Sequence, residues 1–365
     1  MNPLLKEIRH SPMLWLLIFV PAVFIVERTS PESHTALFVL SVLATVPLAG
    51  LLSHATESVA AKTGDAVGGL LNATLGNLTE LVIAITALRA GEYLLVKASI
   101  AGAIVTNTLF MLGASFLLGG LKHHVQDYNR VGARFQAGLL FLATIALLVP
   151  SAIARADDAA GVAFTRTLSL GLAVVLIVTY ALGMLFSLKT HPELFGGGGE
   201  HGEAGEAPWP MGLALPTLAG VTVLVALVSE VFVESVQHAA TDFGMSPAFV
   251  GFIIVALVGG AAEMASAFSG ARKNRLDLSV GIALGSASQI ALFVAPVLVL
   301  LSYVMGPTPM DLQFWPGAIV MMLIAALTAA LVTNSGRSAW FLGVLVLVVY
   351  VIFAMTLYLL PPSVH

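Results

Sequence analysis

The sequence has few charged residues and no cysteine. Asp, Glu, Lys and Arg make up 10% of the 365 residues, whereas hydrophobic residues make up 58%. Soluble domains usually carry about a quarter charged residues, so this composition argues against a soluble fold. The absence of cysteine excludes disulfides and thiolate metal sites. The formal charge of -4, without a basic tract, gives no reason to expect nucleic acid as a partner.

Long apolar runs recur along the whole chain. A helix needs about 20 mainly apolar residues to cross the hydrocarbon layer. The runs therefore predict an all-α integral membrane protein with about eleven transmembrane helices rather than a barrel, whose strands would alternate. The expected spans are 12–27, 35–55, 66–89, 94–119, 134–154, 163–188, 211–234, 247–271, 278–304, 313–333 and 338–360. The first run lacks a small-x-small cleavage site, so we interpret it as a retained helix rather than a signal peptide.

Lysine and arginine are shared unevenly between the two sides of such a bundle. With the N-terminus in the cytoplasm, the inner loops hold eleven of these residues and the outer loops hold five. This bias favours a cytoplasmic N-terminus and an outer C-terminus. The short N-terminal segment points to the inner (plasma) membrane of a prokaryote, and a vacuolar membrane is the less favoured alternative.

A polar segment divides the apolar spans. Residues 189–210 carry four consecutive glycines and four glutamates, a composition typical of a flexible, solvated connector. The expected organisation is an N-terminal transmembrane helix in 1–34, a five-helix repeat in 35–188, an acidic cytosolic linker in 189–210 and a second five-helix repeat in 211–365.

The two predicted repeats share polar positions at a constant separation along the chain. One offset, from Glu80 to Glu263, also relates Arg89 to Arg272 and Gly102 to Gly285. We call it the repeat offset. Five spans, an odd number, separate equivalent helices, so the second repeat would cross the membrane in the opposite direction. Inverted repeats of this kind are typical of secondary transporters, which bind their substrate near the midplane where the halves meet.

Two glutamates fall deep inside predicted spans. An ionised side chain at the bilayer centre costs about 2.5–3.5 kcal/mol on insertion scales, so it seldom persists without a role. Gly76 precedes Glu80 and Gly259 precedes Glu263, and glycine allows a helix to unwind and turn backbone carbonyls toward a cavity. The pair is therefore predicted to bind a cation, against the plainer interpretation that both side chains only fix helix packing.

The groups expected around this pair are all oxygen donors. The predicted cation ligands are the carboxylates of Glu80 and Glu263, backbone carbonyls at Gly76 and Gly259, and the side chains of Asn77, Thr79, Asn107, Ser286, Ser288 and Gln289. Ca²⁺ prefers a shell of about six to eight oxygens, whereas zinc and copper favour sulfur or imidazole. Because burial away from water disfavours ionised carboxylates, the pair is expected to take up about two protons when the cation leaves.

These motifs resemble those of the calcium/proton exchangers of the cation/calcium antiporter superfamily. That family typically reads GN-x-TE-L and GS-I-L-S-N in its first repeat, where this chain has "GNLTEL" and "GAIVTN". Its second repeat typically reads GNAAEH and GSSTQIALF, where this chain has "GGAAEM" and "GSASQIALF". The resemblance covers both halves. It implies that Glu80 and Glu263 bind the cation and the protons, with support from Asn77, Asn107, Ser286 and Gln289.

Three positions depart from the family pattern. Gly260 stands where Asn is usual, Met264 where His is usual and Ala103 where Ser is usual. The second half therefore lacks an amide oxygen and an imidazole that the family pattern would supply. These departures leave Mn²⁺ or Na⁺ open as the transported ion.

The expected function is secondary active transport, without a cofactor and without an enzymatic reaction. The protein is predicted to exchange cytosolic Ca²⁺ for protons by alternating access, with the second and seventh helices moving past the third, fourth, eighth and ninth. The alternatives are an exchanger of Mn²⁺ or Na⁺ against protons and, less favoured, a cation channel, which needs no internal repeat. The partners are then Ca²⁺, protons and the lipid bilayer, and a homo-oligomer is compatible with this plan.

Three further glutamates lie near the ends of the second and seventh spans. Glu57 and Glu234 each begin an "ESV" motif, and Glu230 lies one turn from Glu234. They are candidate gates that attract cations on either side, with interfacial carboxylates in water as the equal alternative. The acidic linker is a candidate sensor of cytosolic cation, although connectors of this composition are more often simply solvated.

Overall fold

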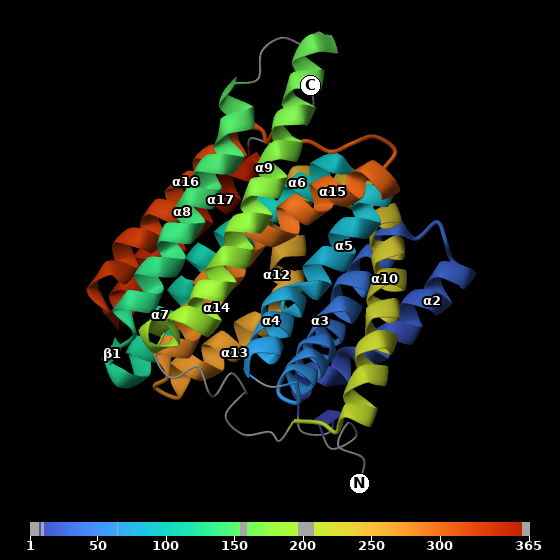
Figure 1. Cartoon of the computed structure of the whole chain (residues 1–365). Coiled ribbons are helices and arrows are strands. Elements are labelled where there is room, and N and C mark those ends of the chain that lie inside the picture. Colours follow the sequence, from blue (N-terminus) through green and yellow to red (C-terminus); the bar gives the residue numbers. More distant parts are fainter. Residues whose placement is uncertain (1–6, 9–10, 64, 154–158, 196–207, 360–365) are drawn as a thin grey trace.

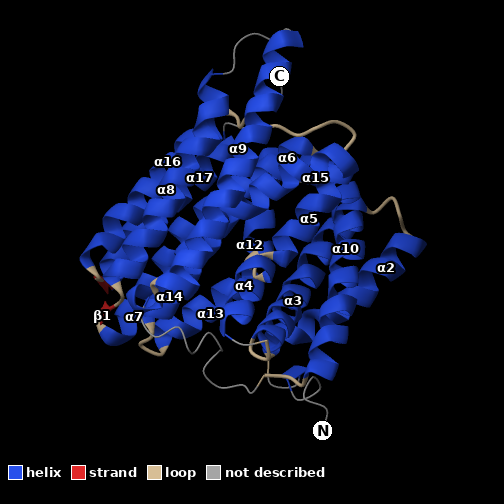
Figure 2. Ribbon diagram, in the orientation of Figure 1, coloured by secondary structure: helices blue, strands red, loops and turns tan. Residues whose placement is uncertain are grey.

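Helices make up nearly all of the protein. The computed structural model describes residues 7–8, 11–63, 65–153, 159–195 and 208–359. Within this part, nine helices are long and apolar enough to cross a membrane, and a pair of helices bent by 58° adds a tenth span. Two short helices occupy the remaining predicted span, 66–89. The expected all-α membrane class is therefore confirmed (Figure 2).

The first half of the chain runs from the N-terminal helix to the end of the first repeat. Its elements are η1 (Pro12–Ile18), α2 (Phe19–Thr29), α3 (His34–Ala60), α4 (Asp65–Leu75), α5 (Leu78–Arg89), α6 (Tyr93–Val105), η2 (Thr106–Met111), α7 (Leu112–His123), β1 (Val125–Asp127), α8 (Arg130–Ile153), α9 (Ala159–Leu185), η3 (Phe186–Thr190) and η4 (Pro192–Phe195).

The second half follows the same plan. Its elements are α10 (Met211–Asp242), α11 (Pro247–Phe249), η5 (Val250–Val255), α12 (Ala256–Gly259), α13 (Ala261–Arg272), α14 (Leu276–Gln289), η6 (Ile290–Val294), α15 (Ala295–Met305), α16 (Pro316–Val332), η7 (Thr333–Ser335), β2 (Arg337–Ala339) and α17 (Trp340–Leu359). The two strands, β1 and β2, pair antiparallel and join the halves at the lower end of the bundle as drawn in Figure 1.

The two halves agree in local detail. Helices α5 and α13 start and end at positions related by the repeat offset. Each is followed by a left-handed residue, Gly91 with φ 80° and Asn274 with φ 61°, and these two positions match as well. Both ends close with the same 2.9 Å backbone hydrogen bond, from Glu92 N to Ala87 O and from Arg275 N to Gly270 O. In Figure 1, α5 leads upward from α4 whereas α13 leads downward from α12. The predicted inverted repeat is therefore confirmed.

Helices α3 and α10 form a long antiparallel pair on one side of the bundle (Figure 1). Their upper ends are joined by two contacts. The Thr35 hydroxyl donates a hydrogen bond to the Asp242 carboxylate, and the ring of His34 stacks on that of His238 with centroids 4.2 Å apart. These are the second and seventh spans, which the sequence analysis predicts to move during transport.

The centre of the bundle comes from equivalent helices of the two repeats. In the span 93–123, 89% of the apolar window is buried, and in 276–305 the share is 67%. Only 17% is buried in the span 161–190, which contains α9. Helices α6, α7, α14 and α15 thus form the interior, and α9 presents most of its surface outward.

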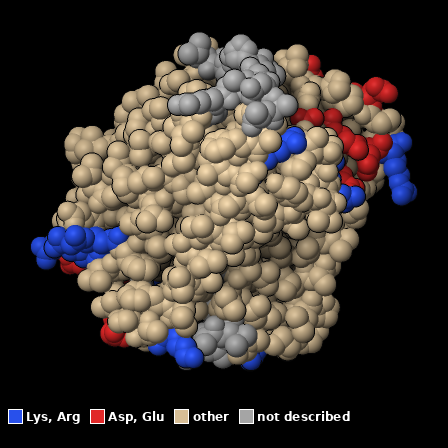
Figure 3. Space-filling view, turned by 45° about the horizontal axis from the view of Figure 1, so that its top comes forward, with Lys and Arg blue, Asp and Glu red and all other residues tan. Residues whose placement is uncertain are grey.

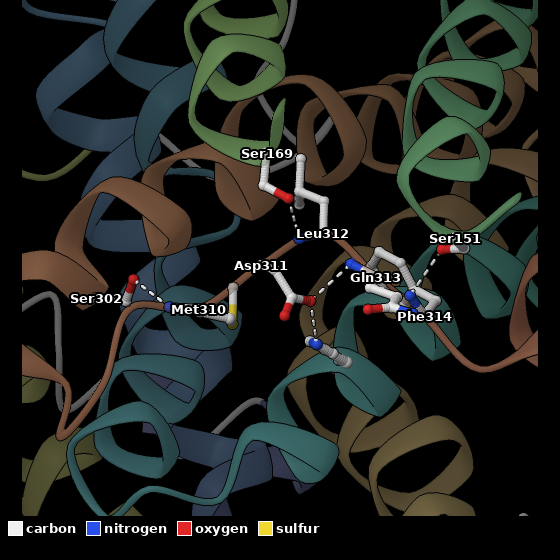
Figure 4. A network of polar contacts seen from close by, with 9 residues as sticks. Ser151, Ser169, Ser302, Met310, Asp311, Leu312, Gln313 and Phe314 are labelled. Atoms are coloured by element: carbon white, nitrogen blue, oxygen red, sulfur yellow. Dashed lines mark hydrogen bonds and ion pairs between the residues drawn. The ribbon is translucent and has the colours of Figure 1, made fainter. Parts of the chain in front are cut away.

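A loop at the upper end connects two of these interior helices, α6 and α15, with the outer helices α8 and α9 (Figure 4). Residues Met310, Leu312 and Phe314 alternate along it and are buried. Their backbone N–H groups donate to three hydroxyls from three different helices, those of Ser302, Ser169 and Ser151. Between them, Asp311 accepts a 2.6 Å contact from Lys97 Nζ on α6. These three N–H groups therefore have the hydrogen-bond partners that buried backbone donors need.

Charged side chains are sparse on the middle of the outer surface seen in Figure 3. In the face shown in Figure 3, Lys, Arg, Asp and Glu gather near the edges, and a broad uncharged surface lies between them. A belt of this kind suits contact with hydrocarbon, where exposed charge is costly.

Part of the predicted linker is ordered. Residues 189–195, expected to be flexible, belong to the helical turns η3 and η4. The Asn129 side-chain amide donates to the backbone oxygen of Leu194 at 3.1 Å, so this segment is held against the lower end of α8. The four glycines and Glu200, Glu203 and Glu206 fall within 196–207, outside the described residues.

Candidate cation site

The two predicted glutamates lie just after breaks in mirrored helices. Helix α4 ends before Gly76 and Asn77, and α12 ends before Gly260. Glu80 and Glu263 are then the third residues of α5 and α13. The first turn of a helix carries unpaired N–H groups and a partial positive charge, which stabilise a carboxylate. The inverted arrangement directs both of these starts toward the middle of the bundle (Figure 1).

The breaks bring the two halves into contact. A Cβ atom at Gly259 would lie 2.9 Å from Cγ of Glu80, so only glycine leaves room for this carboxylate to lie against the opposite half. Glu80 and Glu57 are both close enough to act electrostatically on Glu263. The structure therefore brings the predicted pair together, with Glu57 of α3 nearby.

A chain of amides and a hydroxyl connects the halves beside this pair. Asn77 Oδ1 accepts a 2.7 Å hydrogen bond from Ser286 Oγ, and Asn77 Nδ2 donates to Gln289 Oε1 at 2.6 Å. Asn107 Nδ2 donates to Ser286 Oγ at 2.9 Å. Ser286 also lies close to Glu263. Four of the predicted polar residues thus form one cluster next to the carboxylates.

One oxygen of the pair has no hydrogen-bond partner. Glu263 Oε2 is buried, and no donor reaches it among the described residues. Buried polar atoms are nearly always paired, so this oxygen marks a place where a proton or a cation would fit. The same part of the chain holds no cluster of three or more His, Asp or Glu side chains suited to a metal ion. A cation here would have two carboxylates as charged ligands, which balance a divalent charge.

The other candidate residues differ in where they lie. Thr79 is buried next to Glu80 in the chain. Ser288, by contrast, donates to the backbone oxygen of Gln136 on α8 at 3.2 Å, so its hydroxyl is engaged away from the amide cluster. Glu57 accepts a 3.2 Å hydrogen bond from Ser53, whereas Glu230 and Glu234 are exposed on α10.

A cavity of about 890 Å³ opens at the upper end between α3 and α10. Its lining includes Glu32, the stacked pair His34 and His238, Gln237 and Asp242. We call this cavity the vestibule; the carboxylates of Glu32 and Asp242 in its lining favour the approach of cations. Sequence reasoning missed it, because its residues come from opposite ends of two helices and their stacking has no local signal.

Apolar side chains separate the vestibule from the carboxylates. Along α3, residues 34–36 and Val39 line the vestibule. Val42 and Thr45 then line a small void shared with Ile83, Phe232 and Val255. Phe38 stacks on Phe232 with centroids 5.5 Å apart. We call the rings of Phe38 and Phe232, together with Val42, Ile83 and Val255, the upper seal. Ile83 lies about one turn after Glu80 on α5, so the upper seal lies between the level of the vestibule and that of the carboxylates.

Comparison with known proteins gives consistent matches along nearly the whole chain. The family described as sodium/calcium exchanger protein matches residues 33–189 and 213–359. The Ca²⁺/H⁺ antiporter of Aphanothece halophytica is 38% identical over 367 residues, covering 97% of this chain and 98% of its own. The Ca²⁺/H⁺ antiporter ChaA of Bacillus subtilis is 40% identical over 327 residues, covering 89% of this chain and 92% of its own.

A solved structure agrees with the fold. The structure of native YfkE superposes with a TM-score of 0.83 at 36% identity, covering 95% of this chain and 100% of that one. These matches extend over both blocks of helices that carry the carboxylate pair. The chain therefore belongs to the sodium/calcium exchanger protein family and, within it, to the calcium/proton exchangers.

Proposed function

We propose that the protein is a secondary active transporter that exchanges cytosolic Ca²⁺ for protons. The observation that carries the proposal is the meeting of Glu80 and Glu263 at the starts of two oppositely directed half-helices. The unpartnered oxygen of Glu263 supports a role in which a proton and a cation alternate. The relatives named Ca²⁺/H⁺ antiporters support Ca²⁺ as the ion.

The charge of the pair explains why the two ions would exchange rather than flow. Two ionised carboxylates in the bundle centre carry two negative charges, which are costly away from water. One Ca²⁺ or two protons neutralise them equally. The neutral, loaded states can then rearrange, whereas the empty ionised state is disfavoured. Tight coupling follows from this difference, with about two protons for each divalent cation.

Alternating access would come from α3 and α10 moving against the interior helices. Their joined upper ends favour a common movement, since Thr35 and Asp242 link them. Opening would have to separate the upper seal, where Phe38 meets Phe232. Glu57, which acts electrostatically on Glu263, is then the better supported of the proposed gates, and it would attract cations on the opposite side of the pair.

The placement in the membrane follows the same reasoning. The excess of lysine and arginine in alternate loops supports a cytoplasmic N-terminus and an outer C-terminus. The two matched blocks, 33–189 and 213–359, support repeat boundaries near 35–188 and 211–365. We propose a plasma membrane location, as expected for relatives from bacteria.

Transport in proteoliposomes tests the proposal. An imposed proton gradient is expected to drive Ca²⁺ uptake against its own gradient, which a channel cannot do. A panel of Ca²⁺, Mn²⁺, Na⁺ and K⁺ identifies the ion. Glu80→Gln and Glu263→Gln should each abolish uptake, whereas Glu27→Gln on α2 should not. Normal transport by either of the first two variants would overturn the mechanism.

A further inference from the structure

The amide cluster beside the carboxylates uses an amide at the helix break of the first repeat only. Asn77 stands at the break that precedes Glu80, and its side chain is fixed by Ser286 at 2.7 Å and Gln289 at 2.6 Å. This clamp holds an amide of the first repeat against α14 of the second repeat. In a protein with two matching halves, the repeat predicts a second clamp in which the roles of the halves are exchanged.

The positions that would form the second clamp lack the necessary atoms. At the repeat offset, Gly260 is the counterpart of Asn77, and Ala103 is the counterpart of Ser286. Both partners of the mirrored hydrogen bond are therefore absent together. The counterpart of Gln289 is Thr106, whose hydroxyl lies 3.2 Å from the Tyr350 hydroxyl instead. The cation site thus has neutral oxygen donors from one clamp and none from its mirror.

The backbone does not require glycine at this position. Gly260 has φ -82° and ψ 8°, close to the φ -98° and ψ 29° of Asn77, and both are accessible to any residue. A Cβ atom at Gly260 would lie 3.3 Å from Ala256 O, 3.3 Å from the terminal methyl of Met264 and 3.6 Å from Asn107 Oδ1. Shifts of a few tenths of an ångström, in the flexible Met264 side chain and in the backbone near Ala256, would make room. The consequence of glycine here is chemical rather than conformational.

We propose that Ala103 and Gly260 set the cation affinity and selectivity of this exchanger by leaving the second clamp unbuilt. This inference rests on the proposed function. Ca²⁺ takes about six to eight oxygen ligands, more than the six of a small octahedral ion. A site with one clamp offers fewer protein oxygens and holds Ca²⁺ less firmly. It therefore discriminates less between Ca²⁺ and a six-coordinate ion such as Mn²⁺.

Rebuilding the clamp tests the inference by a gain of function. The double variant Ala103→Ser with Gly260→Asn restores both partners of the mirrored hydrogen bond. We expect its apparent affinity for Ca²⁺ in proton-driven uptake to rise about three- to tenfold, the range of one added oxygen ligand. The affinity for Mn²⁺ should change less. On a logarithmic scale, each single variant should gain less than half as much Ca²⁺ affinity as the double variant. The reason is that the hydroxyl orients the amide, so neither group acts fully alone.

Controls separate this inference from the proposed function. Gly138→Asn is the matched control, because a Cβ atom at Gly138 meets nothing within 4 Å. If the wild type shows no proton-driven Ca²⁺ uptake, the proposed function fails. If the wild type transports and the monodisperse double variant gains no Ca²⁺ affinity, only the present inference fails. Should the Asn variant not fold, Gly260→Ser with Ala103→Ser places a smaller oxygen donor at the same position, and an unchanged affinity there also overturns the inference.

Discussion

Replacing Gly259 with alanine tests whether the position of Glu80 governs cation binding. Gly259 is the last residue of α12. A Cβ atom there would lie 2.9 Å from Cγ of Glu80 and 3.3 Å from its carboxyl carbon. Ordinary van der Waals contact begins at 3.4 Å, so the Glu80 side chain must move by roughly half an ångström to relieve the overlap.

Such a displacement is large for a ligand of Ca²⁺. Distances from Ca²⁺ to oxygen span only about 2.3–2.6 Å, so a shift of this size takes a carboxylate oxygen out of range. Misplacement of about 1 Å in a preorganised site costs on the order of 100-fold. We expect Gly259→Ala to lower the apparent Ca²⁺ affinity by about 10- to 100-fold, or about 1.4–2.8 kcal/mol.

The assay is proton-driven Ca²⁺ uptake in proteoliposomes over a series of Ca²⁺ concentrations. Gly281→Ala on α14 is the matched control, because a Cβ atom there meets nothing within 4 Å. It should transport normally and be slightly more stable, since alanine favours a helix by about 1 kcal/mol over glycine. A Gly259→Ala protein that folds and binds Ca²⁺ within about twofold of the wild type would refute the reasoning.

Three further outcomes are expected. Lowering the pH on the side that loads Ca²⁺ should raise the apparent KM for Ca²⁺, by up to about 100-fold per pH unit if two protons compete; a KM that stays constant with pH would contradict shared occupancy. Lys97→Met leaves Asp311 without its cationic partner and should lower the free energy of unfolding, measured in detergent, by about 1–3 kcal/mol. The double variant Lys97→Met with Asp311→Leu should recover part of this loss. Phe232→Ala removes the ring that stacks on Phe38 and should let protons leak into vesicles without Ca²⁺, as a trapped pH dye would report; an unchanged leak would show that the closure lies elsewhere.

The helices and their mirrored arrangement could be predicted from the sequence. Long apolar runs are a strong signal because a helix must cover the full hydrocarbon thickness. The two helix breaks could also be predicted, because glycine precedes Glu80 and Glu263 at each of them. The ends were less certain. Helix α10 continues to Asp242 rather than ending near 234, because charged residues at a water-facing helix end do not stop the helix.

The detailed geometry of the candidate site could be predicted only in part. Asn77, Asn107, Ser286 and Gln289, which the sequence analysis expects among the oxygen donors around the pair, do form one cluster. Ser288 was predicted as a ligand on the same grounds, yet its hydroxyl is bonded to α8. Two residues along a helix, side chains point about 200° apart, so Ser286 and Ser288 cannot both face the pair unless the helix is distorted. The cation roles of all these residues stay predictions.

The upper seal could not be predicted from the sequence, for a different reason. Its rings and aliphatic side chains look like any other apolar residues of a membrane helix. Their place between the vestibule and the carboxylates is seen only once α3, α5 and α10 are packed together.

Helix α10 is longer than the hydrocarbon layer of a membrane is thick. Thirty-two residues rising about 1.5 Å each extend roughly 48 Å, against about 30 Å of hydrocarbon. At the tilts usual for membrane helices, α10 therefore extends past the hydrocarbon at one or both of its ends. Ions moving along the lipid surface at the upper end would reach the vestibule, where His238 and Asp242 lie. Lipid composition and salt set the local concentration of cations there. That concentration would then control how often a cation reaches the exchanger.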